Sequence, residues 1–549
     1  MLQTKSRKYQ HGVRQSMSGK IFGVVHVILL LSVIVVLGGC AVGPDFAKPE
    51  TKLNENWSEK ADPRIATQTE VDNQWWKTFN DPKLDQLIQM AYQQNLPLQI
   101  SGLRILEARA RLGIAVGGQY PQTEINGSAS NVGLGKNAAN GAGLDRNFGA
   151  YQAGFDASWE LDFWGKYRRD IEAAQANLVG SMADYDNALV TLTGEVARTY
   201  TVIRTYEVLI NLANENAKLQ EEGLRIAKAR FDNGATSELD VTQATTLLES
   251  TRATIPKLQA SLQQAQNALS TLLDQPVGDI KKLLDGAAGI PVSQPKVNVS
   301  MPAELLRRRP DIRSAELYAM SQCARIGMAK ADLYPSFSLF GSVGFQSSSD
   351  GGSQSNNAEF HNLFDGDSFT YSFGPGFNWP IFNFGRIENN VRVQDAKFQQ
   401  LLINYQNTVL KAAQEVEDSM TGFLRAQEAT VFDQNAVNAA KRSLEIAMAQ
   451  YKEGAVDYQR VLDVQRSLLQ EENSLAQTQS SIATNLIALY KALGGGWELR
   501  QGQPIVPEST QTQMQKRTNW GKLLPSKPAP EALADPTPAG KMPMQTVDW

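Results

Sequence analysis

Few side chains in this 549-residue sequence could carry out covalent chemistry. Its histidines are His11, His26 and His361, and its cysteines are Cys40 and Cys323. His11 and His26 lie in an expected leader, so one histidine and one cysteine remain beyond Cys40, too few for a zinc site of His and Cys ligands. No nucleophile elbow or metal-ligand spacing surrounds His361, which falls in an expected exposed loop. An enzyme is therefore disfavoured, no metal or cofactor is expected, and Cys323 is interpreted as a small buried residue in a helix.

The N-terminal apolar stretch ends at the other cysteine. Residues 1–39 carry five basic side chains and no acidic one, with an apolar run over 21–37, which is the pattern of an export signal. The run ends in Leu37-Gly-Gly-Cys40, which resembles a lipobox. Cleavage before Cys40 would free its thiol to take a diacylglycerol and its new amine to be acylated. Ala41 stands where an aspartate would retain an enterobacterial lipoprotein at the inner membrane, so outer-membrane delivery is favoured. The alternative is an uncleaved N-terminal anchor helix.

Charge and hydropathy narrow the classes of protein to which this chain can belong. Loss of the leader would leave 48 basic and 57 acidic residues, a net charge of −9. A negative chain of this kind argues against a nucleic-acid partner. Outside the leader no stretch of 18 apolar residues occurs, so no helix is expected to span a bilayer.

Two segments, 151–163 and 369–381, alternate strictly between apolar and polar residues. A period of two places one face in lipid and the other in water, as in a transmembrane β-strand. Weaker strand signals precede them at 125–132 and 337–346. The Gly-, Ser- and Asn-rich residues in between, 133–147 and 347–367, are expected to form exposed loops.

These strands belong to an internal repeat. Residues 110–121 align with 324–335 at an offset of 214, and 159–166 align with 379–386 at an offset of 220. Each of the first two segments ends in Tyr-Pro, and proline disfavours helical geometry in the residue before it, so a helix should end there. A duplication fills the length of the chain without several unrelated domains.

Each repeat continues into a long helical run, over 167–231 and 387–451. Sixty-five residues at 1.5 Å each make a helix of roughly 100 Å. Both runs end at a matching glycine, Gly234 and Gly454, the residue type that best adopts the left-handed conformation closing a helix.

Helices are expected to return from Ser237 and Asp457, both good N-cap residues. They carry apolar residues seven positions apart: Val241, Leu248, Ile255, Leu262 and Leu269 in one, and Val461, Leu468, Leu475, Ile482 and Leu489 in the other. A strict heptad predicts left-handed coiled packing, although an ordinary amphipathic helix is the simpler alternative. Pro256 has no counterpart in the second copy and predicts a kink or break in the first copy only.

Four strands per chain cannot close a barrel around open space, and an open edge in lipid would leave backbone groups unpaired. Two chains would give eight strands with a filled interior, whereas three would give twelve strands and a pore. A channel therefore requires at least three chains.

Taken together, these motifs resemble the TolC-like outer-membrane factors, in particular the lipidated NodT-type channel subunits of resistance-nodulation-division (RND) efflux systems. The likeness covers about 37–500. Besides the lipobox and the glycine tips, it depends on 305–316 (Leu-Leu-Arg-Arg-Arg-Pro-Asp-Ile-Arg-Ser-Ala-Glu), 324–335 and 489–497. It implies an α+β membrane protein, internally duplicated, with four transmembrane β-strands per chain in a 12-stranded trimeric barrel and a long coiled-coil α-helical periplasmic barrel.

The implied organisation follows the repeat. It comprises a lipoprotein signal peptide (1–39), an acylated N-terminal segment with an equatorial contribution (40–80), a first repeat (81–275), an equatorial linker (276–301), a second repeat (302–497) and an equatorial or extended Pro-rich tail (498–549). From about 501 onward the tail falls outside the likeness and is expected to be largely extended or disordered.

The resemblance also implies a periplasmic gate at the helical tips. Asp463 matches an aspartate that rings the closed tunnel end by trimer symmetry, where three carboxylates would attract cations. Asp240 and Tyr451 match an acid and a tyrosine that bond between neighbouring helix pairs. The sequence departs from the family pattern at Arg460, where some members carry a second aspartate, and at Val456, where the latch arginine stands. The first departure puts the strength of cation preference in doubt, and the second leaves at most part of the latch.

Two further sets of residues complete the expected site. Arg466, one helical turn past Asp463, is expected either to pair with an acid in place of the missing arginine or to be plain surface. Gly234 and Gly454 mark the tips where the hairpins of an adaptor would dock.

The resemblance implies a homotrimer in the Gram-negative outer membrane, lipid-anchored at Cys40, with a tunnel extending into the periplasm. Its implied partners are a periplasmic adaptor (membrane fusion protein), an inner-membrane RND transporter and outer-membrane lipid. It would conduct drugs or other small molecules passively. The alternatives are a channel for type I protein secretion and a periplasmic coiled-coil lipoprotein without a pore, which leaves the four alternating strands unexplained.

Overall fold

The computed structural model describes residues 41–50, 53–67, 73–135, 147–285, 289–292, 296–299, 308–349 and 360–524. The expected signal peptide, Cys40 and the last part of the tail lie outside the described residues. The chain forms two compact units, each assembled from separate stretches of sequence. No helix in the described ranges is both long enough and apolar enough to cross a bilayer.

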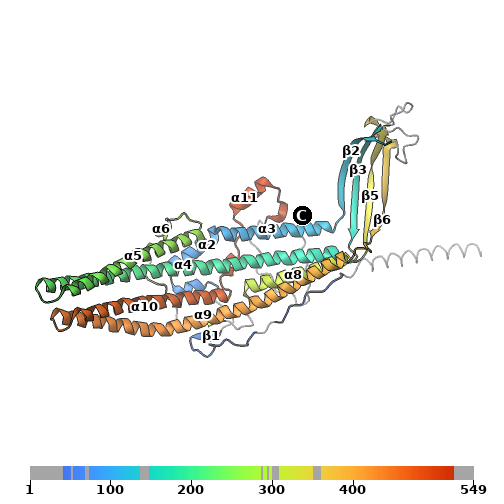
Figure 1. The fold of residues 1–549 in the computed structure, drawn as a ribbon. Helices are drawn as coiled ribbons and strands as arrows, with labels where there is room; N and C mark the ends of the chain where they lie inside the picture. Colours follow the sequence, from blue (N-terminus) through green and yellow to red (C-terminus); the bar gives the residue numbers. More distant parts are fainter. Residues whose placement is uncertain are drawn as a thin grey trace, which may run out of the picture. The chain divides into compact units, whose positions relative to one another are not determined.

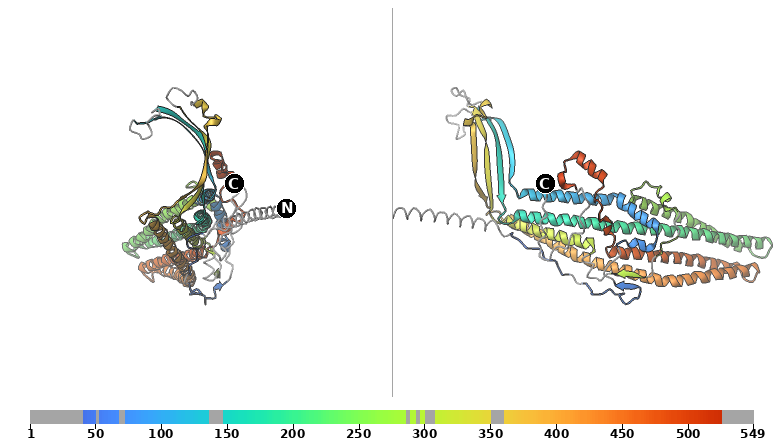
Figure 2. Two further views of the ribbon diagram at one scale, coloured as in Figure 1. Left: turned by 90° about the vertical axis from the view of Figure 1, so that its right-hand side faces the viewer. Right: turned by 180° about the vertical axis from the view of Figure 1, so that it is seen from behind.

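The first unit contains an antiparallel four-stranded sheet in the order β2-β3-β5-β6 (Figure 1). The strands are β2 Gln122–Gly133, β3 Asn147–Leu161, β5 Ser336–Ser349 and β6 Phe369–Asn378, which confirms all four predicted strands. The sheet is curved (Figure 2). The alternating aromatic residues of β6 are exposed, with Phe373 81% and Phe377 74% exposed. Short 3₁₀ turns, η2 Phe360–Asn362 and η3 Gly366–Ser368, precede β6.

Four long helices form the hairpins of the fold. Helices α4 Lys166–Asp232 and α9 Arg386–Lys452 have 67 residues each, within one residue of the predicted runs at both ends. Helices α5 Glu238–Leu272 and α10 Tyr458–Ala492 return alongside them with 35 residues each (Figure 1). In the second hairpin, the heptad residue Leu468 of α10 packs against Ala440 and Leu444 of α9.

The helix ends follow the sequence signals. Gly234 and Gly454 have φ of +74° and +77°, the left-handed conformation predicted for them. The Asp457 side chain caps α10 by accepting from the backbone N–H of Arg460, whereas Ser237 occupies the cap position of α5 without a side-chain bond. Of the predicted kink or break at Pro256, the break is wrong, because α5 continues through this residue. A proline removes one backbone donor, and the other residues of this long helix keep the rest of the ladder.

Among the described residues, the second unit also contains all or part of ten shorter elements. They are β1 Ile65–Thr67, η1 Trp75–Phe79, α2 Pro82–Gln94, α3 Leu96–Gly118, α6 Ile280–Leu284, β4 Val297–Val299, α8 Pro310–Ala331, η4 Trp497–Arg500, α11 Glu508–Arg517 and η5 Gly521–Leu523, with α3 and α8 continuing into the first unit. β1 and β4 pair in parallel, joining the two segments expected to supply the equatorial belt.

The Arg-Arg-Pro-Asp-Ile segment has a structural role in this unit. The nearly buried Arg309 donates to the carbonyl oxygen of Ala492 at 3.0 Å and to Asp311 and Glu415 at 2.7 Å each. Its neighbour Arg308 forms an ion pair with Glu498 at 3.3 Å. The segment thus ties the start of α8 to the end of α10 and to α9.

The prediction that the tail from about 501 onward is largely extended or disordered is wrong for 501–524. Helix α11 and η5 fold there, and Val506, Met514 and Leu524 are buried against Leu106 of α3. These few apolar side chains gain enough burial to order a segment whose overall composition is polar.

Truncating Met514 should release this segment. We expect Met514→Ala to cost about 2 kcal/mol locally, because large-to-small changes in buried positions typically cost 2–5 kcal/mol and this cluster is small. Limited proteolysis of the purified protein should then cut within 508–524 faster. Gln513→Ala, an exposed neighbour on the same helix, is the control and should leave the rate unchanged.

Candidate functional site

The ends of α4 and α9 are tied together at the helical tips. Arg230, in the last turn of α4, donates to the carbonyl oxygen of Tyr451 at 2.5 Å, and its guanidinium carbon lies 4.8 Å from the centre of the Tyr451 ring. The Tyr451 hydroxyl donates to Asp240 Oδ2 at 3.3 Å. Thr236 also donates to the Asp240 carboxylate. The structure therefore brings the predicted pair Asp240 and Tyr451 together and adds Arg230 to them.

A second tyrosine completes this cluster. Tyr458, the first residue of α10, is fully buried, and its ring centre lies 5.1 Å from that of Tyr451. Burial raises the pKa of both hydroxyls, and the negative charge of Asp240 raises them further. Both tyrosines therefore stay protonated at any periplasmic pH, and Tyr451 remains a hydrogen-bond donor to Asp240.

The remaining predicted gate residues face solvent in the single chain. Asp463 is exposed, and its carboxylate accepts from the Gln459 side chain at 2.9 Å. Arg466 and Arg460 are also exposed, and in the described part of the chain no ion pair joins Arg466 to an acid. The single chain thus places Arg466 at the surface. It does not bring Arg466 to the Asp240–Tyr451 pair.

Sequence reasoning missed Arg230. Val456 stands where the family's latch arginine is expected, and Arg230, on the other hairpin, supplies a guanidinium to the same tyrosine. The available signal was an asymmetry between the repeats, because the position equivalent to Arg230 is Gln450. The presence of Arg230 at the first tip, together with Val456 in place of the latch arginine at the second, could have suggested that Arg230 takes over the role of that arginine.

Behind the tip, buried polar residues recur along α10 at intervals of seven: Tyr458, Gln465 and Glu472. Glu472 accepts from Asn216 of α4 at 2.7 Å and pairs with Lys441 of α9 at 3.1 Å. A Cβ on Gly223 of α4 would lie 2.9 Å from the Tyr458 hydroxyl oxygen, so this glycine makes the room that the tyrosine occupies. We call Tyr458, Gln465 and Glu472 with the facing part of α4 the polar seam.

The polar seam is incompletely satisfied. Within the described residues, the Tyr458 hydroxyl, Gln465 Oε1 and both side-chain polar atoms of Gln220 have no hydrogen-bond partner. Buried polar residues in a coiled coil fix its register at a cost in stability. The α4–α10 contact near the tip is therefore weaker than an apolar seam of the same length.

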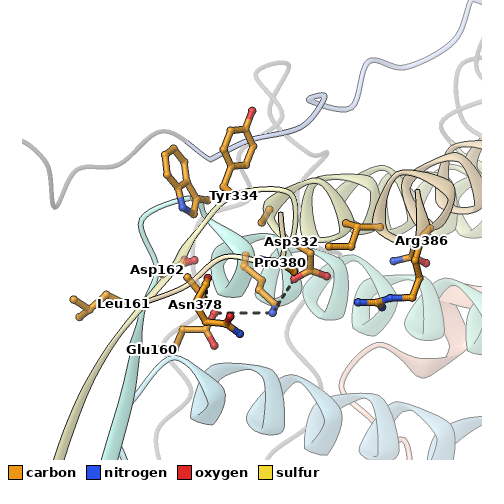
Figure 3. A pocket seen from close by; sticks show the side chains of 14 residues that line it. Glu160, Leu161, Asp162, Asp332, Tyr334, Asn378, Pro380 and Arg386 are labelled. Carbon is orange, nitrogen blue, oxygen red and sulfur yellow. Dashed lines mark hydrogen bonds and ion pairs between the residues drawn. The ribbon is translucent and has the colours of Figure 1, made fainter. Parts of the chain in front are cut away.

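In the first unit, a cavity of about 390 Å³ lies where strands give way to helices (Figure 3). Lys166, at the start of α4, points between Asp332 at 3.0 Å and Glu160 at 4.0 Å. Arg386 lines the cavity at the equivalent position of the second repeat. The lining mixes both signs of charge from both repeats.

The segment that follows Cys40 is held firmly at the same end of the first unit. Asp45 pairs with the nearly buried Arg169 at 2.7 Å, and the Val42 N–H donates to the Trp164 carbonyl at 3.0 Å. Cys323 lies under this segment, with its Sγ 3.6 Å from the Pro44 carbonyl oxygen. Cys323 is 2% exposed, which confirms it as a small buried residue, and burial raises the pKa of its thiol to about 11.

Comparison with known proteins identifies the family. The family model described as "Outer membrane efflux protein" matches residues 87–275 and 301–495, one stretch in each repeat. The chain belongs to the outer membrane efflux protein family. Nodulation protein T of Rhizobium leguminosarum bv. viciae is 31% identical over 462 residues, which are 84% of this chain and 92% of that protein. The cation efflux system protein CusC of Escherichia coli K12 is 29% identical over 85% of this chain and 99% of its own length.

Solved structures agree with the family assignment. The outer-membrane channel OprN superposes with a TM-score of 0.76 at 29% identity, covering 84% of this chain and all of that one. The crystal structure of CusC superposes with a TM-score of 0.69 at 28% identity, covering 83% of this chain and all of that one. The chain is thus an outer-membrane efflux channel with a TolC-like fold, and the predicted family, fold, function class and location are confirmed.

Proposed function

We propose that this channel is the outer-membrane component of a tripartite RND-type pump, in which three copies form one passive conduit. A periplasmic adaptor and an inner-membrane RND transporter would be its partners, and the transporter would supply the energy. The observation that carries the proposal is the four-stranded sheet, whose outer strands β2 and β6 each have one edge without a partner strand among the residues that the structure describes. Such edges must be paired in lipid, and twelve strands leave a pore. The conduit needs no catalytic group.

Several relatives support export of small solutes. Among them are the pyoverdine export outer membrane protein OpmQ and the probable efflux pump outer membrane protein TtgC, both of Pseudomonas putida and 30% and 29% identical to this chain. These names favour small-molecule efflux over type I protein secretion. The substrate itself is set mainly by the transporter, because the conduit is wide.

We also propose a lipid anchor on Cys40. The lipobox supports it, and so does the fixed path of residues 41–45 beside the sheet-bearing end of α4. One relative, of Salmonella typhimurium, is described as a probable outer membrane lipoprotein, SilC.

The gate would lie at the helical tips. Arg230, Tyr451 and Asp240 tie the two hairpins of one protomer, while the exposed Asp463 is available to face its counterparts around the threefold axis. Separation of the hairpins would open the conduit, and the weakly bound polar seam lies where that movement is needed.

Docking of the adaptor at the tips can be tested at Gly234. A Cβ at Gly234 would meet no atom within 4 Å, so a bulky side chain there would change the outer surface of the tip without a clash inside the chain. Its second effect would be backbone strain, because Gly234 has a positive φ. We expect Gly234→Gln to abolish complementation of an efflux-deficient strain, with drug resistance falling to that of the empty vector, while the trimer still forms.

Gly502 supplies the control, because it also has a positive φ of +73° and open space around its Cβ, away from the tips. Gly502→Gln should retain efflux. Normal efflux by Gly234→Gln would show that the adaptor docks elsewhere.

A further inference from the structure

Equivalent residues of the two repeats pair in the same way within the sheet, so a strand pairing seen once can be transferred to the other repeat. In the first hairpin Gln122 pairs with Ser158. Their equivalents, 214 and 220 residues further on, are Ser336 and Asn378, and the structure pairs these two. The tryptophan side chains agree, because Trp159 donates to the Gln119 carbonyl at 2.9 Å, as the equivalent Trp379 donates to the Leu333 carbonyl at 3.1 Å.

The two repeats meet inside the chain along β3 and β5. Ser158 of β3 pairs with Phe340 of β5. Just beyond the strands, the Trp164 and Tyr334 rings stack with centres 4.6 Å apart and planes inclined by 23°. Trp164 also donates to the Pro335 carbonyl at 2.8 Å. This junction is one contact of repeat 1 with repeat 2.

The reverse contact, of repeat 2 with repeat 1, is missing from the single chain. The equivalent of Trp164 is Phe384, and the equivalent of Tyr334 is Tyr120. Phe384 is 101% exposed and Tyr120 is 56% exposed. Phe384 also has φ of +49°, a conformation that is strained for a bulky residue and persists where surrounding contacts stabilise it.

We infer that these free surfaces join successive protomers of the proposed trimer, with β6 pairing with β2 of the partner subunit. Applying the two offsets to the Ser158–Phe340 pair places Asn378 opposite Asn126 of the partner subunit. The same operation stacks Phe384 on Tyr120 of the partner subunit, in the place that Trp164 and Tyr334 occupy within the chain. The inference rests on the proposed trimer and adds its register and its rim contact.

Side-chain size favours this register over its neighbours. It sets the exposed rings of Tyr371 and Phe377 opposite Gly133 and Gly127 of the partner subunit. A shift of two residues keeps the same faces in lipid but puts Phe377 opposite Ile125 or Ala129 instead. Aromatic rings that cover glycines on a neighbouring strand are a known means of fixing register.

Cysteine cross-linking in the full-length protein tests the register. Asn378→Cys would be combined in turn with Glu124→Cys, Asn126→Cys and Ser128→Cys, in a Cys323→Ala background. Directly opposite residues have Cβ atoms about 4.5–5.5 Å apart and diagonal ones about 7–8 Å, so only the directly opposite pair comes near disulfide distance. We expect the Asn126→Cys combination to give covalent trimers on a denaturing, non-reducing gel several-fold faster than the other two.

Each other outcome has a distinct meaning. Faster cross-linking through Glu124→Cys or Ser128→Cys would overturn the register and leave the trimer intact. No cross-link in a protein that is trimeric by light scattering in detergent would overturn edge pairing between β6 and β2. A monomer in detergent would contradict the proposed trimer itself.

The rim contact has an independent test. Phe384→Ala and Tyr120→Ala should each lower the dissociation temperature of the trimer by several degrees, and their combination should add little, because both remove one contact. Phe384→Tyr keeps the ring and should restore the wild-type value. Phe382→Ala is the matched control, since Phe382 is 87% exposed but its equivalent, Asp162, takes no part in the Trp164–Tyr334 stack. Equal losses from Phe384→Ala and Phe382→Ala would overturn the rim contact.

Discussion

Arg230→Ala should increase spontaneous opening of the channel by roughly a hundredfold. The change removes a charge-assisted hydrogen bond and a cation–π contact between the two hairpins. For a partly exposed group these amount to about 1 kcal/mol per protomer, so three protomers lose about 3 kcal/mol of closed-state stability. Because every 1.4 kcal/mol is a factor of ten, the closed-to-open ratio should fall by about two orders of magnitude.

Single-channel recording in planar bilayers would measure this opening. Arg225→Ala is the control, because Arg225 lies on the same helix and, among the described residues, forms an ion pair only with Glu222, one turn earlier. It should leave the open probability unchanged. Tyr451→Phe and Asp463→Ala should raise it less than Arg230→Ala, since Tyr451→Phe removes one 3.3 Å hydrogen bond and Asp463→Ala also relieves repulsion between carboxylates. If all three variants keep the wild-type closed-state current, the gate lies elsewhere.

Arg500→Leu should lower the free energy of unfolding of the second unit by about 3–5 kcal/mol, the usual cost of leaving a buried charge without its partner. Arg500, in η4, forms a two-pronged ion pair with Asp186 of α4, with Nη2 to Oδ2 at 3.0 Å. The Asp186 side chain is 4% exposed and that of Arg500 is 12% exposed, so solvent screens the pair little. Arg198→Leu is the control, since Arg198 forms a surface ion pair with Glu195 on the same helix.

The loss of stability in Arg500→Leu should depend on pH. Burial raises the pKa of Asp186 above its ordinary value of 3.8, and the nearby arginine opposes that rise. Without Arg500 the folded-state pKa rises further, so the folded variant binds a proton that the unfolded chain has released. Its stability then falls as pH increases from about 4 through the folded-state pKa, and the deficit is smaller at pH 5 than at pH 8. Denaturant unfolding at both values measures it, and the double variant Asp186→Leu, Arg500→Leu should recover most of the loss. An equal deficit at both pH values would contradict this account.

The elements predicted most accurately from the sequence are those with long, regular patterns. Residues 167–231 differ from α4 by a single residue at each end, because helical composition runs unbroken up to a glycine that closes it. The alternating strands were recovered for the same reason, since a period of two repeated over ten residues has no competing explanation.

The parts that were missed depend on contacts between distant residues. Arg230 and Tyr451 are 221 positions apart, and no local pattern indicates that they meet. The ordered tail depends on Met514 and Val506 finding Leu106 on α3, which composition alone could not show. Within the tip, Asp240 and Tyr451 were identified through the family resemblance, and their spacing alone would not have singled them out.

The pairing of β3 with β5 in the centre of the sheet also affects the order of folding. Leu161 and Phe337, which pair across β3 and β5, are 176 positions apart, and the whole α4–α5 hairpin lies between them. Helical hairpins close from nearby residues and form early, whereas distant strand pairing must wait for slow loop closure. During biogenesis the newly exported polypeptide should therefore pass through a stage in which its helical hairpins are folded and its four transmembrane strands are not yet paired. The unpaired strand edges of such an intermediate would be prone to aggregate until the bilayer receives them.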